Sequence, residues 1–306
     1  MDKQDFNALV NLAMEQPGRA AMKPVVEKEI LHYDIFHALD KAGLLTDLVF
    51  QGGTSLRLCR GSNRFSEDLD FAGGKDFTSQ KMQAIKSCIE KHIGDRYGLL
   101  VEVKEPREMA MLPDYDGVKV DKWQVSVETA PRQRNLPRQR VKLEIANIPA
   151  YTRELMPLKL NYDFLMGYGA VLVNTETLDE IMADKLVAFP ASVKNIRYRD
   201  IWDLAWLDQK GAKLDPSLVA KKVADYRIEG FAQLLGDAIE RLPALVAGKP
   251  FTQQMERFID SETILATLAK PGFLDYLTKT VGGLLGNLAL HFKSGPDAKP
   301  EPAFKM

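Results

Sequence analysis

The chain has 306 residues, of which 41 are basic and 42 acidic, so its formal charge is −1. This length suggests two domains, or one domain with a large appendage. With 45% hydrophobic and 27% charged residues, the chain can bury a sizeable core, which excludes an intrinsically disordered protein. The near-zero charge also excludes a uniformly basic nucleic-acid binder, so any contact with a polyanion must come from a local patch.

The chain has too few cysteines, and too scattered a set of histidines, to predict a disulfide framework or a zinc site. Cys59 and Cys88 are the only cysteines, and the four histidines are scattered along the chain. The N-terminal run MDKQDFNALVNLAMEQ is polar and charged from its second residue, unlike a secretory signal. No apolar run reaches the ~18 residues that a membrane span needs. We therefore expect a cytoplasmic protein without membrane contact.

Periodicity predicts an N-terminal region of helices and strands. Apolar residues between Val25 and Leu39 recur at three- and four-residue spacing, which predicts a helix that ends before Gly43. The following elements are predicted in chain order: strand 46–50, the start of a helix at 54–59, strand 68–72, helix 78–93, and strands 99–103, 118–128, 140–145 and 171–173. Residues 149–169 show no regular pattern.

The C-terminal part of the chain has a different pattern. From Thr177 to Phe292 the periodicity is helical almost throughout. The tail SGPDAKPEPAFKM is rich in proline and poor in apolar residues, so we expect residues 294–306 to be disordered. These patterns predict an α/β domain over residues 1–175 and a helical domain over residues 176–293.

The segment FQGGTSLRLCRGSNRFSEDLDF, residues 50–71, contains a candidate phosphate site. A strand delivers Gly52 and Gly53 to the N-terminus of a helix, where backbone N–H groups can approach a phosphate and the helix dipole favours an anion. Thr54 and Ser55 add hydroxyl donors. Alone, a Gly-Gly turn is usually only a turn, and neither G-x-x-x-x-G-K-[ST] nor G-x-G-x-x-G is present.

Paired carboxylates follow on the next predicted strand. Asp68 and Asp70 are two residues apart, so both should point to the same face and can share one metal ion. Together with the glycine turn, and with Arg57, Arg60 and Arg64 between the two motifs, they could hold a nucleoside triphosphate and its Mg²⁺. The alternative for the acidic pair alone is a solvated sheet edge.

Two further segments add candidate groups. The strand RVKLEIAN supplies Glu144, which could complete a two-metal site; the alternative is a surface glutamate. Lys185 lies in the helical segment DEIMADKLVAF, where a lone lysine is usually solvated.

The segment NIRYRDIWDLAWL carries acids at helical spacing. Arg199 and Asp200 can start a helix, and Asp203 lies one turn further on. Arg197 and Arg199 could pair with these acids or with a polyphosphate. A salt-bridged helix cap explains this segment equally well.

A basic stretch, RQRNLPRQRVK, contains five cations and no acid: Arg132, Arg134, Arg138, Arg140 and Lys142. Such a patch favours a nucleic-acid partner, through sequence-independent and salt-sensitive phosphate contacts. The alternatives are a basic hairpin that keeps an edge strand soluble, or a docking face for an acidic protein.

In this order, the blocks GGTSLRL, RFSEDLDF, KLEI, the lysine helix and RYRDIWDL resemble the AbiEii/AbiGii family of nucleotidyltransferase-like toxins, relatives of the MenA-type mycobacterial toxins. The resemblance covers residues 25–210. It implies an α+β fold, in which a polymerase-β-like nucleotidyltransferase domain with a mixed sheet is joined to an all-helical domain. It further implies a bilobed molecule that takes a nucleoside triphosphate and Mg²⁺.

The resemblance also assigns roles to residues of this chain. It implies nucleotide binding at Gly52, Gly53, Thr54, Arg199 and Asp203, metal binding at the catalytic acids Asp68 and Asp70, and catalytic roles for Lys185 and Asp200. Ser55 and Arg64 are added as nucleotide-binding residues from the composition of the glycine segment itself. Glu144 as the third metal ligand is our inference from the fold. The chain departs from the family pattern in one place, because Asp184 precedes Lys185 instead of following it.

These roles describe nucleotidyl transfer to an acceptor hydroxyl, oriented or deprotonated by Asp200 or Glu144. Because relatives modify RNA, notably the acceptor end of tRNA, RNA is the first expected acceptor. The resemblance implies a cognate antitoxin and a role in phage defence. The alternatives are a phosphotransferase acting on a protein or small molecule, and a non-catalytic nucleotide-binding regulator.

Overall fold

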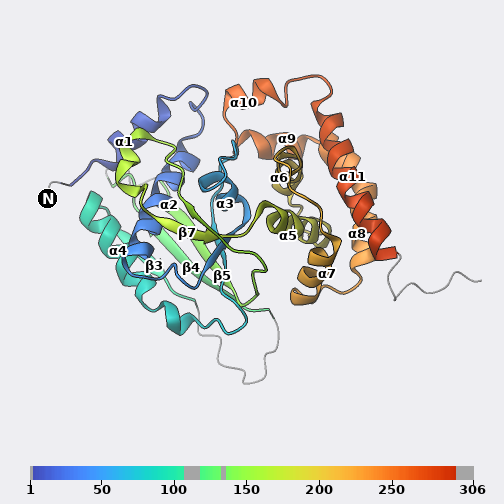
Figure 1. Ribbon diagram of the computed structural model, residues 1–306. Coiled ribbons are helices and arrows are strands. Elements are labelled where there is room, and N and C mark those ends of the chain that lie inside the picture. The colour runs from blue at the N-terminus through green and yellow to red at the C-terminus, as the bar shows by residue number, and fades with distance from the viewer. Residues whose placement is uncertain (1–2, 107–117, 132–135, 294–306) are drawn as a thin grey trace, which may run out of the picture.

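The computed structural model describes residues 3–106, 118–131 and 136–293 (Figure 1). Its centre is a seven-stranded sheet in the order β3-β4-β5-β2-β1-β7-β6. The strands are β1 (Val49–Gln51), β2 (Leu69–Ala72), β3 (Val101–Lys104), β4 (Val120–Val127), β5 (Gln139–Ala146), β6 (Glu154–Pro157) and β7 (Leu172–Thr175). The pairs β2–β5 and β1–β7 are parallel and the others antiparallel, so the sheet is mixed, as expected.

One face of the sheet packs against the helices α2 (Lys23–Lys41) and α4 (Ala84–Tyr97), and α1 (Phe6–Met14) packs on α2. Helix α2 has Pro24 in its first turn, where the fixed φ of proline suits a helix. Helix α4 ends at Gly98, whose φ of 70° gives the left-handed C-cap that glycine adopts without strain. Apolar residues at alternate positions of β4 and β5 fill the core beneath these helices.

The C-terminal helices gather beside the sheet domain (Figure 1) and bury a second core. They are α5 (Leu178–Ala191), α6 (Tyr198–Gln209), α7 (Pro216–Asp225), α8 (Phe231–Ala247), α9 (Lys249–Glu256), α10 (Ser261–Ala266) and α11 (Phe273–Lys293). The side chains of Thr177, Asp215 and Asp260 cap the N-termini of α5, α7 and α10, which satisfies backbone N–H groups there.

The two cores share residues across their junction. Leu56, from the short helix α3 (Gly52–Leu58), belongs to the helical core, whereas Phe258 belongs to the sheet core. The N–H of Phe65 donates to the carbonyl of Phe258 over 2.7 Å. The division near residue 175 stays a prediction, and the separate cores support it.

The strands predicted from alternation are confirmed, but one strand was missed. Residues 149–169, which showed no pattern, contain β6 and a 3-10 turn, Asp163–Tyr168. Strand β6 is four residues long, lies at the sheet edge and ends in Pro157, so it has too little alternation to detect. In the described part of the chain, no helix is both long and apolar enough to cross a membrane. The predicted disordered tail lies outside the described residues.

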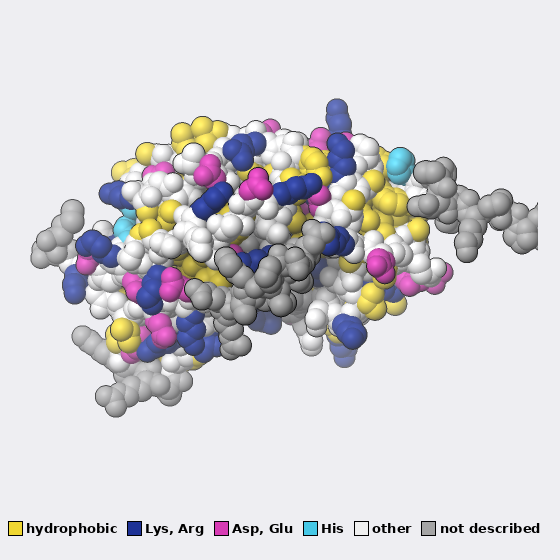
Figure 2. Space-filling view, turned by 90° about the horizontal axis from the view of Figure 1, so that it is seen from below, with side chains coloured by type: hydrophobic (Ala, Val, Ile, Leu, Met, Phe, Trp, Pro, Cys, Tyr) yellow, Lys and Arg dark blue, Asp and Glu magenta, His cyan; other side chains and the backbone are white. Residues whose placement is uncertain are grey.

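Charges of both signs are interspersed over the surface seen in Figure 2, with no broad field of one sign. This distribution agrees with the near-zero net charge. Any polyanion contact on this surface must therefore be local.

Candidate active site

The glycine turn between β1 and α3 brings backbone and carboxylate together. Gly52 has a φ of +76°, a conformation that glycine adopts without strain. A Cβ at this position would lie 3.0 Å from Oδ2 of Asp70, which faces Gln51 across the β1–β2 pair. Glycine at residue 52 therefore allows both the turn and the close approach of the Asp70 carboxylate.

Three carboxylates line up beside this turn. Asp70 on β2 is in register with Glu144 on the parallel strand β5. Asp68 directly precedes β2, and its carboxylate accepts from the backbone N–H of Lys142 over 3.4 Å. Glu144 pairs with Lys122 over 3.1 Å, and Asp68 lies 3.7 Å from Nζ of Lys142. The structure thus brings together the three acids that were predicted as metal ligands.

The charge of these acids is incompletely balanced. Burial, then the nearby charges of Glu144 and Asp68, raise the pKa of Asp70 from 3.8 to about 6, although Arg197 and Lys185 oppose the rise. No group of three such side chains in the described residues is arranged to hold a metal by itself. Mg²⁺, however, is usually bound through one or two carboxylates together with substrate phosphates. Asp68 and Asp70 fit that requirement, because their excess negative charge and oxygen ligands both suit a hard cation.

The two hydroxyls of the turn make internal bonds. The Thr54 hydroxyl donates to the carbonyl of Asp68, and Oγ of Ser55 donates to the carbonyl of Gly52 over 2.9 Å. Both side chains are buried. In this structure they hold the turn against β2, which links the position of the glycines to that of the carboxylates.

A buried ion-pair network lies behind the turn. Arg64 binds Asp203 through two hydrogen bonds of 2.7 Å, and Nζ of Lys185 lies 2.7 Å from the same carboxylate. Lys185 also donates to Asp200 over 2.9 Å, and Asp200 accepts from Arg197 as well. Arg64, Asp200 and Asp203 are almost fully buried.

The cations of this network control the state of its acids. Burial alone would raise the pKa of Asp203, but Arg64 and Lys185 hold it well below its ordinary value. The same competition, with Lys185 and Arg197 as the cations, lowers the pKa of Asp200. Both acids are therefore ionised at neutral pH and anchor Lys185 between them.

Gly53 is required by this network. A Cβ on Gly53 would lie 2.3 Å from Nη2 of Arg64 and 3.3 Å from Oγ of Ser66. The Arg64 guanidinium thus packs directly on the backbone of the turn. The second glycine of the motif permits this contact between the turn and the network.

A cavity of about 400 Å³ lies between the sheet and the helices. Of the predicted site residues, its walls include Gly52, Asp70, Glu144 and Lys185. Apolar side chains of α5, with Tyr226 and Ile228, form another part of the lining. The other predicted residues lie outside this lining: Gly53, Thr54, Ser55, Arg64, Asp68, Arg199, Asp200 and Asp203.

Arg199 lies apart from the cavity. Its guanidinium is 3.5 Å from Glu67 and sits over the ring of Phe258, 4.7 Å from the centroid. The ion pair of Arg64 and Asp203 is behind the glycine turn. Asp68 lies beside the turn, and its side chain is 33% exposed to solvent.

Sequence reasoning missed a second buried cluster beside the cavity. Lys222 is fully buried and its Nζ contacts Glu176 at 3.1 Å, Glu180 at 2.6 Å and Asp184 at 3.1 Å. Asp184, the residue that departs from the family pattern, lines the cavity. Glu180 and Asp184 share one face of α5, and Glu176 lies just before the N-cap of that helix, so the three acids recur every four residues. Two acids one turn apart on a helix face are a signal for a cation that pairs with them. Nothing in that signal points to Lys222, which comes from α7.

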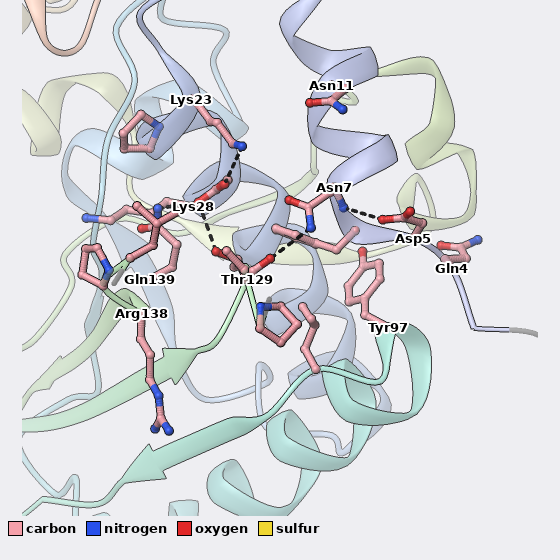
Figure 3. Close-up of a pocket in the computed structure, with 18 of the residues that line it drawn as sticks. Gln4, Asp5, Asn7, Asn11, Lys23, Lys28, Tyr97, Thr129, Arg138 and Gln139 are labelled. Carbon is pink, nitrogen blue, oxygen red and sulfur yellow. Dashed lines mark hydrogen bonds and ion pairs between the residues drawn. The ribbon is translucent and has the colours of Figure 1, made fainter. Parts of the chain in front are cut away.

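A larger cavity, of about 1020 Å³, lies beside the starts of α1 and α2 (Figure 3). Its acids already have partners. Asp5 accepts from the N–H of Asn7 over 2.9 Å and caps α1, and Glu27 accepts from the amide of Gln139 over 2.5 Å. None of the predicted nucleotide-binding, metal-binding or catalytic residues lines this cavity, although Arg138 of the basic stretch does. The smaller cavity therefore remains the candidate active site.

Comparison with known proteins identifies the family. The profile of nucleotidyl transferase AbiEii toxins of type IV toxin–antitoxin systems matches residues 34–279. The nucleotidyltransferase toxin MenT4 from Mycobacterium tuberculosis has a similar structure, with a TM-score of 0.58, 20% identity, and coverage of 94% of this chain and 93% of that chain.

Protein JHP933 from Helicobacter pylori aligns with a TM-score of 0.49 at 20% identity, over 88% of this chain and 93% of its own. No curated protein sequence matches. At these identities the structural likeness shows the fold alone, which is that of a nucleotidyltransferase. Because the family profile spans most of the chain, including the glycine turn, the carboxylates and the ion-pair network, this chain belongs to the AbiEii family of nucleotidyltransferase toxins of type IV toxin–antitoxin systems.

Proposed function

We propose that this enzyme transfers a nucleotidyl group, with the help of Mg²⁺, from a nucleoside triphosphate to a hydroxyl of RNA, with tRNA as the first acceptor to test. Membership of the family supplies the reaction class and the triphosphate substrate. The observation that carries the proposal is the register of Asp70 with Glu144, beside Asp68, on the wall of a cavity that also contains Lys185. A cognate antitoxin follows from the family, and a role in phage defence is part of the proposal.

The carboxylates would hold the metal. Asp68 and Asp70 are the proposed ligands of one Mg²⁺, and Glu144 is positioned to contribute to a second ion. When bound, Mg²⁺ would neutralise the charge that develops on the phosphoryl oxygens. The raised pKa of Asp70 supports this role, because an uncompensated group of acids is stabilised by a cation.

Lys185 would stabilise the phosphates or the departing pyrophosphate. Its ammonium is fixed by Asp200 and Asp203 and lines the cavity. A preorganised cation of this kind needs no reorganisation as charge develops. The same contacts argue for anchoring roles for Asp203 and Arg64, and for Thr54 and Ser55 as braces of the turn.

Two residues were candidates to orient or deprotonate the acceptor hydroxyl. Asp200 uses one carboxylate oxygen for Lys185 and the other for Arg197, and its pKa is lowered, so it is a poor proton acceptor. Glu144 lines the cavity and has only Lys122 as an ion-pair partner among the described residues. These contacts favour Glu144 for this role, with Asp200 as an anchor of Lys185.

Labelled nucleotides test the proposal directly. The protein would be incubated with each α-labelled triphosphate, Mg²⁺ and total cellular RNA, with Asp70→Asn as the control. Label on RNA with release of pyrophosphate is the expected result. Transfer of a γ-label with release of a nucleoside diphosphate would instead show a phosphotransferase. Nucleotide binding without any transfer would show a regulator.

A further inference from the structure

The side of the sheet opposite α2 and α4 is polar over three strands. Successive strand residues point to opposite faces, and Val103, Val125 and Leu143 point into the core. The other face, which we call the open face, is apolar at the cavity, where Val120 is paired with Ala146. Beyond that pair it carries the alternate residues Glu102, Lys104, Lys122, Gln124, Ser126, Arg140, Lys142 and Glu144. All except Ser126 are exposed or partly exposed.

Cross-strand register arranges these residues in rows that end at the proposed metal ligands. Lys104 is opposite Gln124, and Gln124 is opposite Lys142. Lys142 continues this row to Asp68, 3.7 Å from its Nζ. With strands about 4.8 Å apart, the row from Lys104 to Asp68 extends over about 14 Å. The neighbouring row runs from Lys122 through Glu144 to Asp70.

The open face has cations in excess at its outer end. Lys104 and Arg140 are exposed and make no ion pair with another described residue. The nearest acid on the face, Glu102, is bound by Arg138 over 3.2 Å. The face therefore offers cations to an anionic ligand. Lys104 and Lys142 lie in the row that leads to the carboxylates, and Arg140 lies in the adjacent row, two residues from Lys142 along β5.

We propose that the open face binds the acceptor as a single-stranded RNA segment, held by its phosphates, so that a hydroxyl reaches the carboxylates past Lys142. The identity of the acceptor rests on the proposed function. The described part of the face from Lys122 to Ser126 and from Arg140 to Glu144 has no apolar or aromatic side chain. A protein partner would need such anchors, whereas the phosphates of an RNA strand can be bound by cations without base stacking.

Salt dependence of RNA binding tests the assignment without relying on catalysis. The variant Lys104→Gln/Arg140→Gln removes two cations that touch neither the carboxylates nor the cavity. The control Lys270→Gln/Lys279→Gln removes the same charge from exposed positions next to and within α11. Binding of a labelled single-stranded RNA about 12 nucleotides long would be followed by fluorescence anisotropy across a salt series, without nucleotide.

The expected result is weaker RNA binding by the open-face variant, with a log–log salt slope about 1.4 shallower, because each lost phosphate contact contributes about 0.7 for a single strand. The affinity for a triphosphate with Mg²⁺ should not change. An unchanged slope, or an equal change in the control, would overturn the assignment. Weaker binding of polyglutamate with unchanged RNA binding would do so as well, and would indicate an acidic protein partner.

The outcome separates this inference from the proposed function. Transfer of an α-label to RNA by a variant with an unaltered slope would leave the function standing and place the acceptor elsewhere. Salt-sensitive RNA binding through Lys104 and Arg140 without any transfer would support the open face as an RNA-binding surface and contradict the proposed transfer reaction.

Discussion

Replacing Gly53 with alanine should destabilise the fold through Arg64. The new Cβ would lie 2.3 Å from Nη2 of Arg64, well inside van der Waals contact. The guanidinium cannot move away freely, because two hydrogen bonds of 2.7 Å hold it to Asp203 and a third of 2.7 Å reaches the carbonyl of Phe65. The methyl group therefore forces either the turn or the ion pair to shift.

The magnitude depends on which of the two gives way. If the turn relaxes and the pair survives, the cost is that of overpacking a core, about 1–3 kcal/mol. If Arg64 leaves Asp203, a buried carboxylate loses a partner, which costs about 3–5 kcal/mol. The second case also frees Asp203 to move, and with it Lys185, so the transfer rate should fall together with stability.

Urea unfolding of Gly53→Ala, with nucleotide affinity measured in parallel, checks this reasoning. Gly236→Ala in α8 is the matched control, because no atom beyond the adjoining backbone of its own helix lies within 4 Å of its new Cβ. Alanine in a helix interior should stabilise that variant by about 0.5–1 kcal/mol. Combining Gly53→Ala with Arg64→Lys should give less than the sum of the two losses, since lysine lacks the clashing nitrogen. Gly53→Ala with weaker nucleotide binding but unchanged stability would refute this account.

Three further predictions concern the charged groups. Asp70→Asn should abolish transfer yet raise metal-free stability at pH 7 by at most about 3 kcal/mol, because the folded pKa of Asp70 is about 6 against an ordinary value of 3.8. The fold therefore disfavours the ionised carboxylate, and wild-type stability should fall as pH rises from 4 to 6, as urea titrations of both proteins would show. Lys185→Ala should cost about 2–4 kcal/mol of transition-state stabilisation with a smaller loss of nucleotide affinity, and unchanged turnover in steady-state assays would contradict its role. Asp203→Asn should lose about 3–5 kcal/mol at neutral pH; because the folded pKa of Asp203 is depressed, unfolding curves of variant and wild type should converge as pH drops below 4.

Local motifs of the site were predictable because their spacing is enough to define them. The turn at Gly52 and the pair Asp68 and Asp70 lie within one strand–helix–strand unit, so the sequence alone brings them together. The partners in the ion-pair network were not predictable in the same way. Arg64 and Asp203 are 139 residues apart, and only the packing of α6 on the sheet domain shows that they bind each other rather than a phosphate.

The basic stretch illustrates a second limit. Arg132 and Arg134 lie outside the described residues, and Arg138 is engaged by Glu102 and by Glu128 at 3.6 Å. Arg140 and Lys142 do face outward on β5, but the cations beside them come from β3 and β4. The run of basic residues in the sequence therefore identified one strand of the open face, β5. The rest of the face depends on how β3 and β4 pair with β5, and the sequence of one strand does not show that register.

The shared residues at the junction of the two cores have a consequence for motion. Leu56 is packed among the helices, Phe258 is packed against the sheet, and Arg64 is bound to Asp203 across the boundary. Swinging the lobes apart about a hinge would expose both apolar side chains and separate a buried ion pair, so opening of that kind is costly. Under the proposed function, nucleotide and pyrophosphate would then exchange without separation of the two lobes. We expect the same ties to make the halves unfold cooperatively, so that a chain cut near residue 175 does not yield two stable pieces.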